Sequence, residues 1–489
     1  MESEVSTLAT ATLTEIAQAV RTGSASAVEV TRAALARIES KNASINAYLH
    51  VAAESALADA ERVDRARAQG AELPLAGVPI GVKDNLCTRG IPTTCASKIL
   101  AGYVPPYDAH VVQQLRAAGA VMLGKLNLDE FAMGSSNETS AFGPVKNPWD
   151  LTRAPGGTSG GSAAAVALGL GAACLGSDTG GSVRQPASFC GVTAIKPSYG
   201  RVSRYGLIAF ASSLDQVGPI ARNMRDAATL LGAIAGHDAR DATSAVRPVP
   251  DYVAECGREV RGLRLGVVRG MLDEGCAPSV KLAITRALEQ FAALGCEIVE
   301  VDMPNLRHAI SVYYIVAPAE ASSNLARFDG MRYGLRVDGE DLRDTFGKTR
   351  DAGFGAEVKR RIMLGTYVLS AGYYDAFYLK AQKVRTLIQR DYAHAFERCD
   401  ALLTPTAPTP AFKLGEKLDD PLAMYLADIF TLPASLAGIP AVSVPCGLSD
   451  ERLPIGLQLA APAFEEARLV RLGAAYEQVS GWDYRPPGF

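Results

Sequence analysis

The sequence has no excess of charge of either sign. Its 49 lysines and arginines nearly balance 52 aspartates and glutamates, which leaves a formal net charge of −3 over 489 residues. A domain that binds nucleic acid directly usually carries a clustered basic surface. The composition therefore gives no sign of direct nucleic-acid binding, although it leaves open RNA that a partner protein handles.

Paired cysteines, an export signal and long apolar runs are also missing. The nine cysteines are scattered, with no C-x-x-C pair and no Cys/His cluster at zinc spacing. We therefore expect no metal site and a reducing compartment. The first residues contain no basic segment followed by an apolar run, and apolar stretches such as 163–176 are short and rich in glycine. These features predict a cytoplasmic protein without a membrane segment.

Histidine is scarce, which disfavours a Ser-His-Asp triad. The five histidines lie outside any motif, although pairing of one with a serine in space stays open. Residues 157–161, "GTSGG", match the G-x-S-x-G nucleophile elbow, but a turn-like segment precedes them instead of a strand. Residues 77–84 have the wrong spacing for a phosphate-binding P-loop, and residues 169–174 lack the third glycine of a dinucleotide fingerprint.

Alternating helical and strand-like patterns predict an α/β fold. Helical periodicity dominates residues 8–70, and short apolar runs alternate with helices from about 75 to 180 and from 245 to 300. Residues 305–400 form a more helical elaboration, after which strand-like pieces return. This order is typical of a large sheet covered by helices on both faces. We expect a single domain over 1–489, and two domains divided near 240 are the alternative.

Two glycine-rich segments carry the strongest chemical signal. The segment "GSDTGGSVRQP" (176–186) places Ser182 after a Thr-Gly-Gly run. Glycines allow successive backbone N–H groups to turn inward around an anionic oxygen. The predicted oxyanion hole therefore consists of Thr179, Gly180, Gly181 and Ser182, with the Ser182 hydroxyl as nucleophile.

A serine nucleophile also needs a base, and lysine is the candidate. Lys83 ends an apolar run, and the upstream loop offers Thr158 or Ser159 as a hydroxyl between Lys83 and Ser182. The ordinary lysine pKa of about 10.4 must fall by roughly three units for the amine to be neutral near pH 7. Burial in an apolar environment lowers a lysine pKa in this way.

These residues resemble a known family. Residues 156–200, together with "GVPIGVKDN" upstream, are similar to the amidase signature family, whose catalytic unit is Ser-cisSer-Lys. The resemblance implies the large mixed sheet of that family, with Lys83 as base and Ser182 as the nucleophile that forms an acyl-enzyme. The bridging position falls on Thr158, where the family usually has a serine after a cis peptide bond, and Ser159 is the second candidate.

Other segments resemble one branch of the family, the glutaminase subunits of tRNA-dependent amidotransferases. The matching segments are 320–336, 358–385 and 424–445. The resemblance implies hydrolysis of glutamine to glutamate and ammonia, without a cofactor in this polypeptide. The B subunit would use ATP and Mg²⁺ to amidate misacylated Glu-tRNA(Gln) or Asp-tRNA(Asn), which it would mainly bind. A small C subunit would complete a heterotrimer.

The same resemblance implies a glutamine pocket. Arg361 would bind the substrate carboxylate, Asp428 its ammonium group, and Tyr313 would line the pocket, while Arg360 leaves the arginine register open by one residue. A stand-alone amidase for aryl or aliphatic amides is the alternative function. Cysteines near the proposed site are expected to be small buried residues and not nucleophiles. They are Cys87, Cys95, Cys174 and Cys190.

Overall fold

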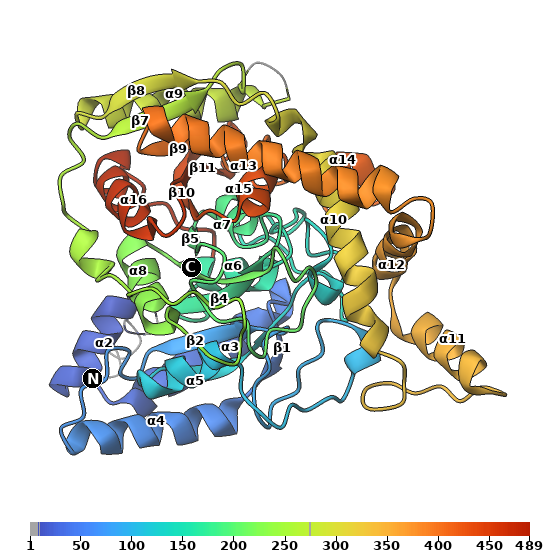
Figure 1. Ribbon diagram of the computed structural model, residues 1–489. Helices are drawn as coiled ribbons and strands as arrows, with labels where there is room; N and C mark the ends of the chain where they lie inside the picture. The colour runs from blue at the N-terminus through green and yellow to red at the C-terminus, as the bar shows by residue number, and fades with distance from the viewer. Residues whose placement is uncertain (1–7, 9, 273–274) are drawn as a thin grey trace.

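A single large sheet is the frame of the molecule. The computed structural model describes residues 8, 10–272 and 275–489, and in these residues 11 strands form one sheet in the order β1-β3-β2-β4-β6-β5-β10-β11-β9-β7-β8 (Figure 1). The strands are β1 (Tyr48–Val51), β2 (Pro79–Lys83), β3 (Val121–Leu126), β4 (Ala173–Asp178), β5 (Thr193–Lys196), β6 (Gln216–Ala221), β7 (Arg264–Val268), β8 (Glu297–Val301), β9 (Ala401–Pro405), β10 (Ala441–Leu448) and β11 (Pro454–Ala460).

Helices cover both faces of this sheet. Side chains of α8, α9 and α16 pack against one face, and those of α6 and α7 pack against the other. The helices are α2 (Leu13–Thr22), α3 (Ala27–Ile45), α4 (Ala53–Ala68), α5 (His110–Ala117), α6 (Gly160–Ala167), α7 (Arg184–Cys190), α8 (Met224–Ile234), α9 (Pro278–Ala293), α10 (Ala309–Asn324), α11 (Leu342–Gly353), α12 (Ala356–Leu369), α13 (Lys380–Arg398), α14 (Pro421–Leu426), α15 (Leu432–Ala437) and α16 (Glu466–Ser480).

The sheet is mixed, and its parallel part positions the site. β2 pairs in parallel with both β3 and β4, whereas β4 pairs antiparallel with β6. The carboxyl ends of parallel neighbours meet at the same edge of a sheet, where ligands commonly bind in α/β folds. Lys83 at the end of β2 therefore lies beside the glycine-rich segment that follows Asp178 at the end of β4. The predicted fold class is confirmed.

Two parts of the fold differ from the sequence prediction. Residues 8–70 are largely helical, as expected, and contain α2, α3 and α4, with Ser26 as the N-cap of α3, but β1 lies between α3 and α4. Tyr48–Val51 pair antiparallel with β3 at the sheet edge, and the Tyr48 hydroxyl donates to Leu170 O at 2.7 Å. The sequence analysis also gives no strand at β5 or β6. Both are short and fully buried, so they lack the polar alternation that marks a half-exposed strand.

The predicted helical elaboration contains α10, α11, α12 and α13. In Figure 1 α10 and α12 lie side by side at the right of the view, and α11 extends beyond them. A short 3₁₀ turn, η2 (Glu130–Ala132), lies between β3 and α6 in the chain. Within the described residues, no helix combines the length and apolar character needed to cross a membrane. The assignment of the chain to one domain stays a prediction.

Candidate active site

Lys83 lies in a fully buried cluster of hydroxyl groups. Its Nζ is 2.6 Å from Thr158 Oγ1, 2.9 Å from Ser159 Oγ and 3.1 Å from Ser177 Oγ. The side chain has no exposed surface. Burial lowers the pKa of Lys83 to about 7, although three buried aspartates nearby act in the opposite direction. The amine is therefore neutral in a large fraction of molecules near pH 7, as a general base must be.

The loop that carries the candidate bridging hydroxyl is held from two sides. Gln185 Oε1 accepts a hydrogen bond from Gly157 N at 2.8 Å, and Asn137 Nδ2 donates to Thr158 O at 3.1 Å. The peptide bond between Gly157 and Thr158 is cis. Ser159 N donates to Ser182 O at 3.0 Å, which places this loop directly against the second glycine-rich segment.

The segment around Ser182 has the properties of an anion-binding loop. Within the described residues, the amides of Gly180, Gly181 and Ser182 donate no hydrogen bond to the protein, and the Ser182 hydroxyl has no partner. A side chain at Gly181 would overlap Thr431, so glycine is required there. The loop can thus present its N–H groups to the oxygen of a bound carbonyl.

Buried polar groups fix this loop, and of these the sequence analysis assigns only Thr179, as part of the predicted oxyanion hole. Arg184 Nη2 is 2.9 Å from Asp178 Oδ1, and both side chains have no exposed surface. Arg184 also donates to Thr431 O at 2.9 Å. The hydroxyl of Thr179 donates to Asp215 Oδ1 at 2.6 Å. Asp178 and Arg184 flank the Thr-Gly-Gly run in the sequence. Charged residues are rarely buried unless they are paired, so two opposite charges beside a predicted buried loop could have indicated this ion pair.

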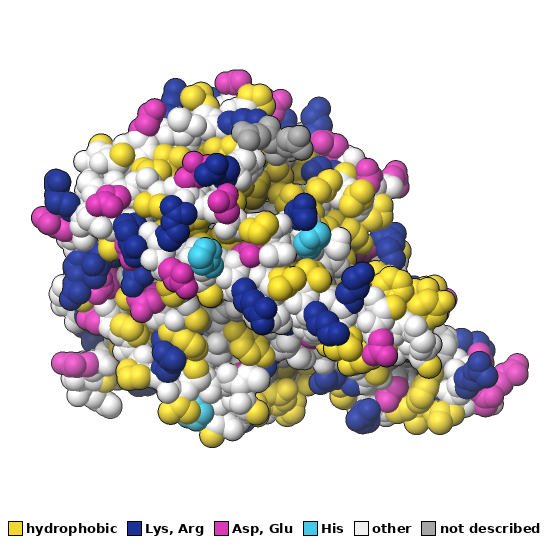
Figure 2. Space-filling view, turned by 45° about the horizontal axis from the view of Figure 1, so that its top comes forward, with side chains coloured by type: hydrophobic (Ala, Val, Ile, Leu, Met, Phe, Trp, Pro, Cys, Tyr) yellow, Lys and Arg dark blue, Asp and Glu magenta, His cyan; other side chains and the backbone are white. Residues whose placement is uncertain are grey.

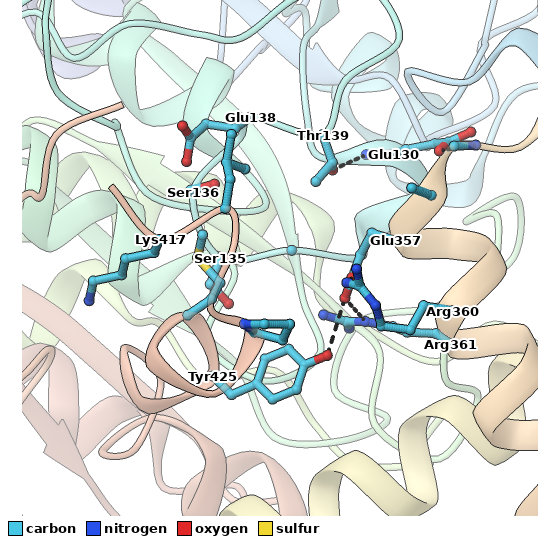
Figure 3. A pocket seen from close by; sticks show the side chains of 16 residues that line it. Glu130, Ser135, Ser136, Glu138, Thr139, Glu357, Arg360, Arg361, Lys417 and Tyr425 are labelled. Carbon is cyan, nitrogen blue, oxygen red and sulfur yellow. Dashed lines mark hydrogen bonds and ion pairs between the residues drawn. The ribbon is translucent and has the colours of Figure 1, made fainter. Parts of the chain in front are cut away.

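A cavity of about 260 Å³ lies between α12, α14 and the segment after η2 (Figure 3). Arg361 lines it with a side chain only 3% exposed, and its Nε is 2.7 Å from Glu357 Oε1. Within the described residues, its two terminal nitrogens donate to no protein group. The neighbouring Arg360 is half-exposed. The geometry thus makes Arg361 the buried cation of this wall.

Asp428 is a buried carboxylate near this cavity. The hydroxyl of Ser135, a cavity-lining residue, donates to Asp428 Oδ2, whereas Oδ1 is buried without a hydrogen-bond partner. Burial raises the pKa of Asp428 to about 7, and the Ser135 contact acts against this shift. An unsatisfied buried carboxylate oxygen is costly, so this atom is suited to accept hydrogen bonds from a ligand cation.

Tyr313 connects the cavity side with the Ser182 loop. Its ring lies 5.1 Å from the ring of Tyr314, which stacks on Tyr425 at 3.6 Å, and Tyr425 lines the cavity. A side chain at Gly180 would meet the Tyr313 hydroxyl at 2.8 Å. The structure therefore brings Tyr313 against the predicted oxyanion loop, and the aromatic stack leads from there to Arg361.

The nearby cysteines are buried thiols. Burial raises the pKa of Cys174 to about 12 and also raises the pKa values of Cys87, Cys95 and Cys190. A raised thiol pKa disfavours the reactive thiolate. In the part of the chain that the structure describes, no group of three or more metal-binding side chains lies together.

Known proteins share this sequence and fold over nearly the whole chain. A family model described as Amidase matches residues 29–470. The A subunit of glutamyl-tRNA(Gln) amidotransferase from Moorella thermoacetica is 59% identical to this chain over 463 residues, which are 94% of this chain and 95% of that protein.

Solved structures give the same result. The crystal structure of the A subunit of glutamyl-tRNA(Gln) amidotransferase from Thermotoga maritima has a TM-score of 0.79 and 43% identity, covering 94% of this chain and 93% of that one. The peptide amidase from Stenotrophomonas maltophilia has a TM-score of 0.84 and 31% identity, covering 97% and 98%. The chain therefore belongs to the amidase family and, within it, to the group of glutamyl-tRNA(Gln) amidotransferase A subunits.

Proposed function

We propose that this chain is the glutaminase subunit of a tRNA-dependent amidotransferase. The observation that carries the proposal is the combination of a buried lysine–hydroxyl cluster with a buried Arg361 and a buried Asp428 near one cavity. The lysine cluster supports amide hydrolysis. The two opposite charges support a substrate that is itself a free amino acid, because each charge of the amino acid then has a partner.

The reaction begins with attack of the Ser182 hydroxyl on the side-chain amide carbon of glutamine. The Ser182 proton passes to the bridging hydroxyl, whose own proton passes to Lys83. The N–H groups of the Gly180 loop stabilise the oxyanion. When the tetrahedral intermediate collapses, the proton on Lys83 returns through the same hydroxyl to the leaving nitrogen. Ammonia departs, a glutamyl ester remains on Ser182, and water hydrolyses it to glutamate.

Hydrogen-bond counting favours Thr158 over Ser159 as the bridging hydroxyl. Ser159 Oγ donates to Ser177 O at 3.2 Å and accepts from Ser177 N at 3.2 Å, so its proton is already committed. Within the described residues, Thr158 Oγ1 has Lys83 as its hydrogen-bond partner and no other. Its proton is therefore available to the lone pair of a neutral Lys83.

The substrate would lie with its α-carboxylate on Arg361 and its α-ammonium group on Asp428. The free terminal nitrogens of Arg361 form a planar fork that matches a carboxylate. Asp428 Oδ1 lacks a protein partner among the described residues and can accept from the ammonium group. Tyr313 would then border the side chain of the substrate close to Gly180.

The remaining steps would belong to partners. The names of the relatives describe them as subunits, which supports assembly with B and C subunits. The B subunit would use ATP and Mg²⁺ and would hold the misacylated tRNA, Glu-tRNA(Gln) or Asp-tRNA(Asn). The surface supports this division, because basic and acidic side chains are interspersed over the face in Figure 2 and the net charge is −3.

The test is ammonia release from glutamine, asparagine and benzamide by the purified chain, alone and co-expressed with its B and C subunits. We expect release that is selective for glutamine and that rises with the partners. Equal activity on benzamide without partners would instead indicate a stand-alone amidase. The peptide amidase of known structure shows that a similar fold occurs in such an enzyme.

Replacing Thr158 distinguishes the two candidate hydroxyls. Thr158→Ser keeps the hydroxyl and is expected to retain activity within about tenfold, whereas Thr158→Val removes the proton relay and lowers kcat by roughly 10²–10⁴-fold. Ser159→Ala, which leaves Thr158 in place, is the matched control and is expected to have the smaller effect. Steady-state glutaminase assays measure all three. A larger loss in Ser159→Ala than in Thr158→Val would transfer the role to Ser159.

Activity is expected to rise with pH up to about 7 and then to level off. Lys83 must be neutral to accept a proton, and Asp428 must be ionised to bind the ammonium group; burial brings both pKa values to about 7. Below this pH, kcat/KM for glutamine falls at least about tenfold per pH unit. A pH series of initial rates measures this dependence. A profile that is flat from pH 5 to 8 would contradict the assignment of Lys83 as base.

A further inference from the structure

Two consecutive residues at η2, Asp129 and Glu130, contact different parts of the site. Asp129 contacts the segment that holds the Thr158 loop, and Glu130 contacts the start of the helix that carries Arg361. Asp129 Oδ2 accepts from Asn137 N at 2.8 Å, and Asn137 Nδ2 donates to the carbonyl of Thr158 at 3.1 Å. A side chain on Gly157 would overlap Asp129. Asp129 thus anchors the loop that carries the bridging hydroxyl.

Glu130 faces the helix that carries Arg361. Its Oε2 accepts a hydrogen bond from Gly355 N at 2.8 Å, and the Ser97 hydroxyl donates to its Oε1. Gly355 is the N-cap residue of α12 and has no side chain to cap the helix itself. The Glu130 carboxyl group therefore accepts one of the N–H groups that the start of a helix leaves without an intrahelical partner. Figure 3 shows Glu130 at the beginning of the helix that bears Glu357, Arg360 and Arg361.

A contact between two aromatic rings also holds η2 against the start of α12. Phe131, next to Glu130, lies 5.6 Å from the ring of Phe354, the residue before Gly355. Arg361 follows Gly355 by six residues, or about 9 Å of helix rise. A shift at the start of α12 is therefore transmitted to the guanidinium of Arg361, because a helix moves as a rigid rod over so short a length.

We propose that Glu130 is a positioning residue that sets the distance between Arg361 and the Ser182 loop, and so selects glutamine over asparagine. The inference rests on the proposed glutaminase function. The two amino acids differ by one methylene group, so a carboxylate clamp separates them only if its distance from the nucleophile is fixed. Asp129 holds the Thr158 loop, whose Ser159 N–H donates to Ser182 O. Glu130 holds the start of the helix that carries Arg361. A misplacement of about 1 Å is enough to cost 10²-fold in rate.

The experiment compares Glu130→Ala and Glu130→Gln with the unmodified chain, each co-expressed with its partner subunits. We expect Glu130→Ala to lower kcat/KM for glutamine by roughly 10–100-fold and to reduce the glutamine-to-asparagine ratio of kcat/KM. Glu130→Gln keeps the shape and an oxygen that accepts from Gly355 N, so it is expected to restore most of both quantities. If Glu130→Ala fails to fold, the glutamine-to-asparagine ratio is measured on Glu130→Gln instead.

A double-mutant cycle with Arg361→Ala identifies the path of the effect. If Glu130 acts through Arg361, adding Glu130→Ala to Arg361→Ala changes kcat/KM for glutamine by less than about twofold. Asp226→Asn is the matched control, because its carboxylate caps α2 by accepting from Leu13 N at 3.0 Å, far from this junction in the chain. It is expected to lower thermal stability and leave the glutamine-to-asparagine ratio unchanged.

Two results would overturn the inference. One is an equal loss for glutamine and asparagine in Glu130→Ala, and the other is a loss that adds fully to that of Arg361→Ala. Both differ from failure of the proposed function, in which the unmodified chain with its partners would release no ammonia from glutamine.

Discussion

Ser182→Ala is expected to lower glutaminase activity by roughly 10⁴–10⁶-fold, the loss typical of removing the nucleophile of a serine hydrolase. The Ser182 hydroxyl makes no hydrogen bond to a described residue, so its removal leaves no buried group unpaired. The variant should therefore unfold at the same temperature as the unmodified chain. Ammonia release and thermal unfolding, measured on the same preparation, separate loss of chemistry from loss of fold.

Ser162→Ala is the control for Ser182→Ala. Ser162 is also buried, and its hydroxyl donates to Leu175 O at 3.1 Å, away from Lys83. We expect it to keep glutaminase activity within about threefold, with a small loss of stability of about 1 kcal/mol from the lost hydrogen bond.

Mass spectrometry of the unmodified chain, quenched rapidly during reaction with glutamine, should find a glutamyl adduct on the peptide that contains Ser182. Full activity in Ser182→Ala would refute the mechanism.

Arg184→Met is expected to destabilise the protein by about 3–5 kcal/mol, because it leaves Asp178 buried without its partner. The two side chains have no exposed surface, and Arg184 bonds both oxygens of Asp178, at 2.9 and 3.0 Å. Burial opposes ionisation of Asp178, yet Arg184 holds the pKa of its carboxyl below the usual value. Chemical unfolding of the variant measures the loss, which should be accompanied by loss of activity because the pair brackets the Ser182 loop.

An exposed ion pair provides the comparison for Arg184→Met. Arg269 lies 2.7 Å from Glu300, with both side chains more than half exposed, so Arg269→Met should cost less than about 1 kcal/mol. The double variant Asp178→Asn/Arg184→Met removes both charges and should be more stable than Arg184→Met alone. Equal stability losses at Arg184 and Arg269 would show that the buried pair is not what holds the loop.

The Ser182 and Lys83 assignments show how far local sequence signals reach. The Thr-Gly-Gly run before Ser182 predicts a loop with free amides because glycine's lack of a side chain acts on the backbone directly. The apolar run before Lys83 predicts a buried strand end. Neither signal predicts that Lys83 and the Ser182 loop lie side by side, because their proximity depends on β2 and β4 being parallel neighbours.

The proposed glutamine pocket depends more on tertiary structure. Arg360 and Arg361 are equivalent in sequence, and only the orientation of α12 buries Arg361 beside Glu357 and leaves Arg360 half-exposed. Glu130 gives no signal at all, because its role depends on a helix that begins more than 200 residues later. Residues so far apart in the chain are brought together by packing, and their contact leaves no local pattern.

By itself, the sequence determined the α/β class, the two glycine-rich segments, and the lysine and serine that are the catalytic candidates. These are consequences of periodicity and of glycine, which act within a few residues. The tertiary structure decided which hydroxyl lies nearest Lys83, how far burial lowers the Lys83 pKa, and which of the two neighbouring arginines is buried. Those properties arise from desolvation and from contacts between distant segments, and both exist only once the sheet has formed.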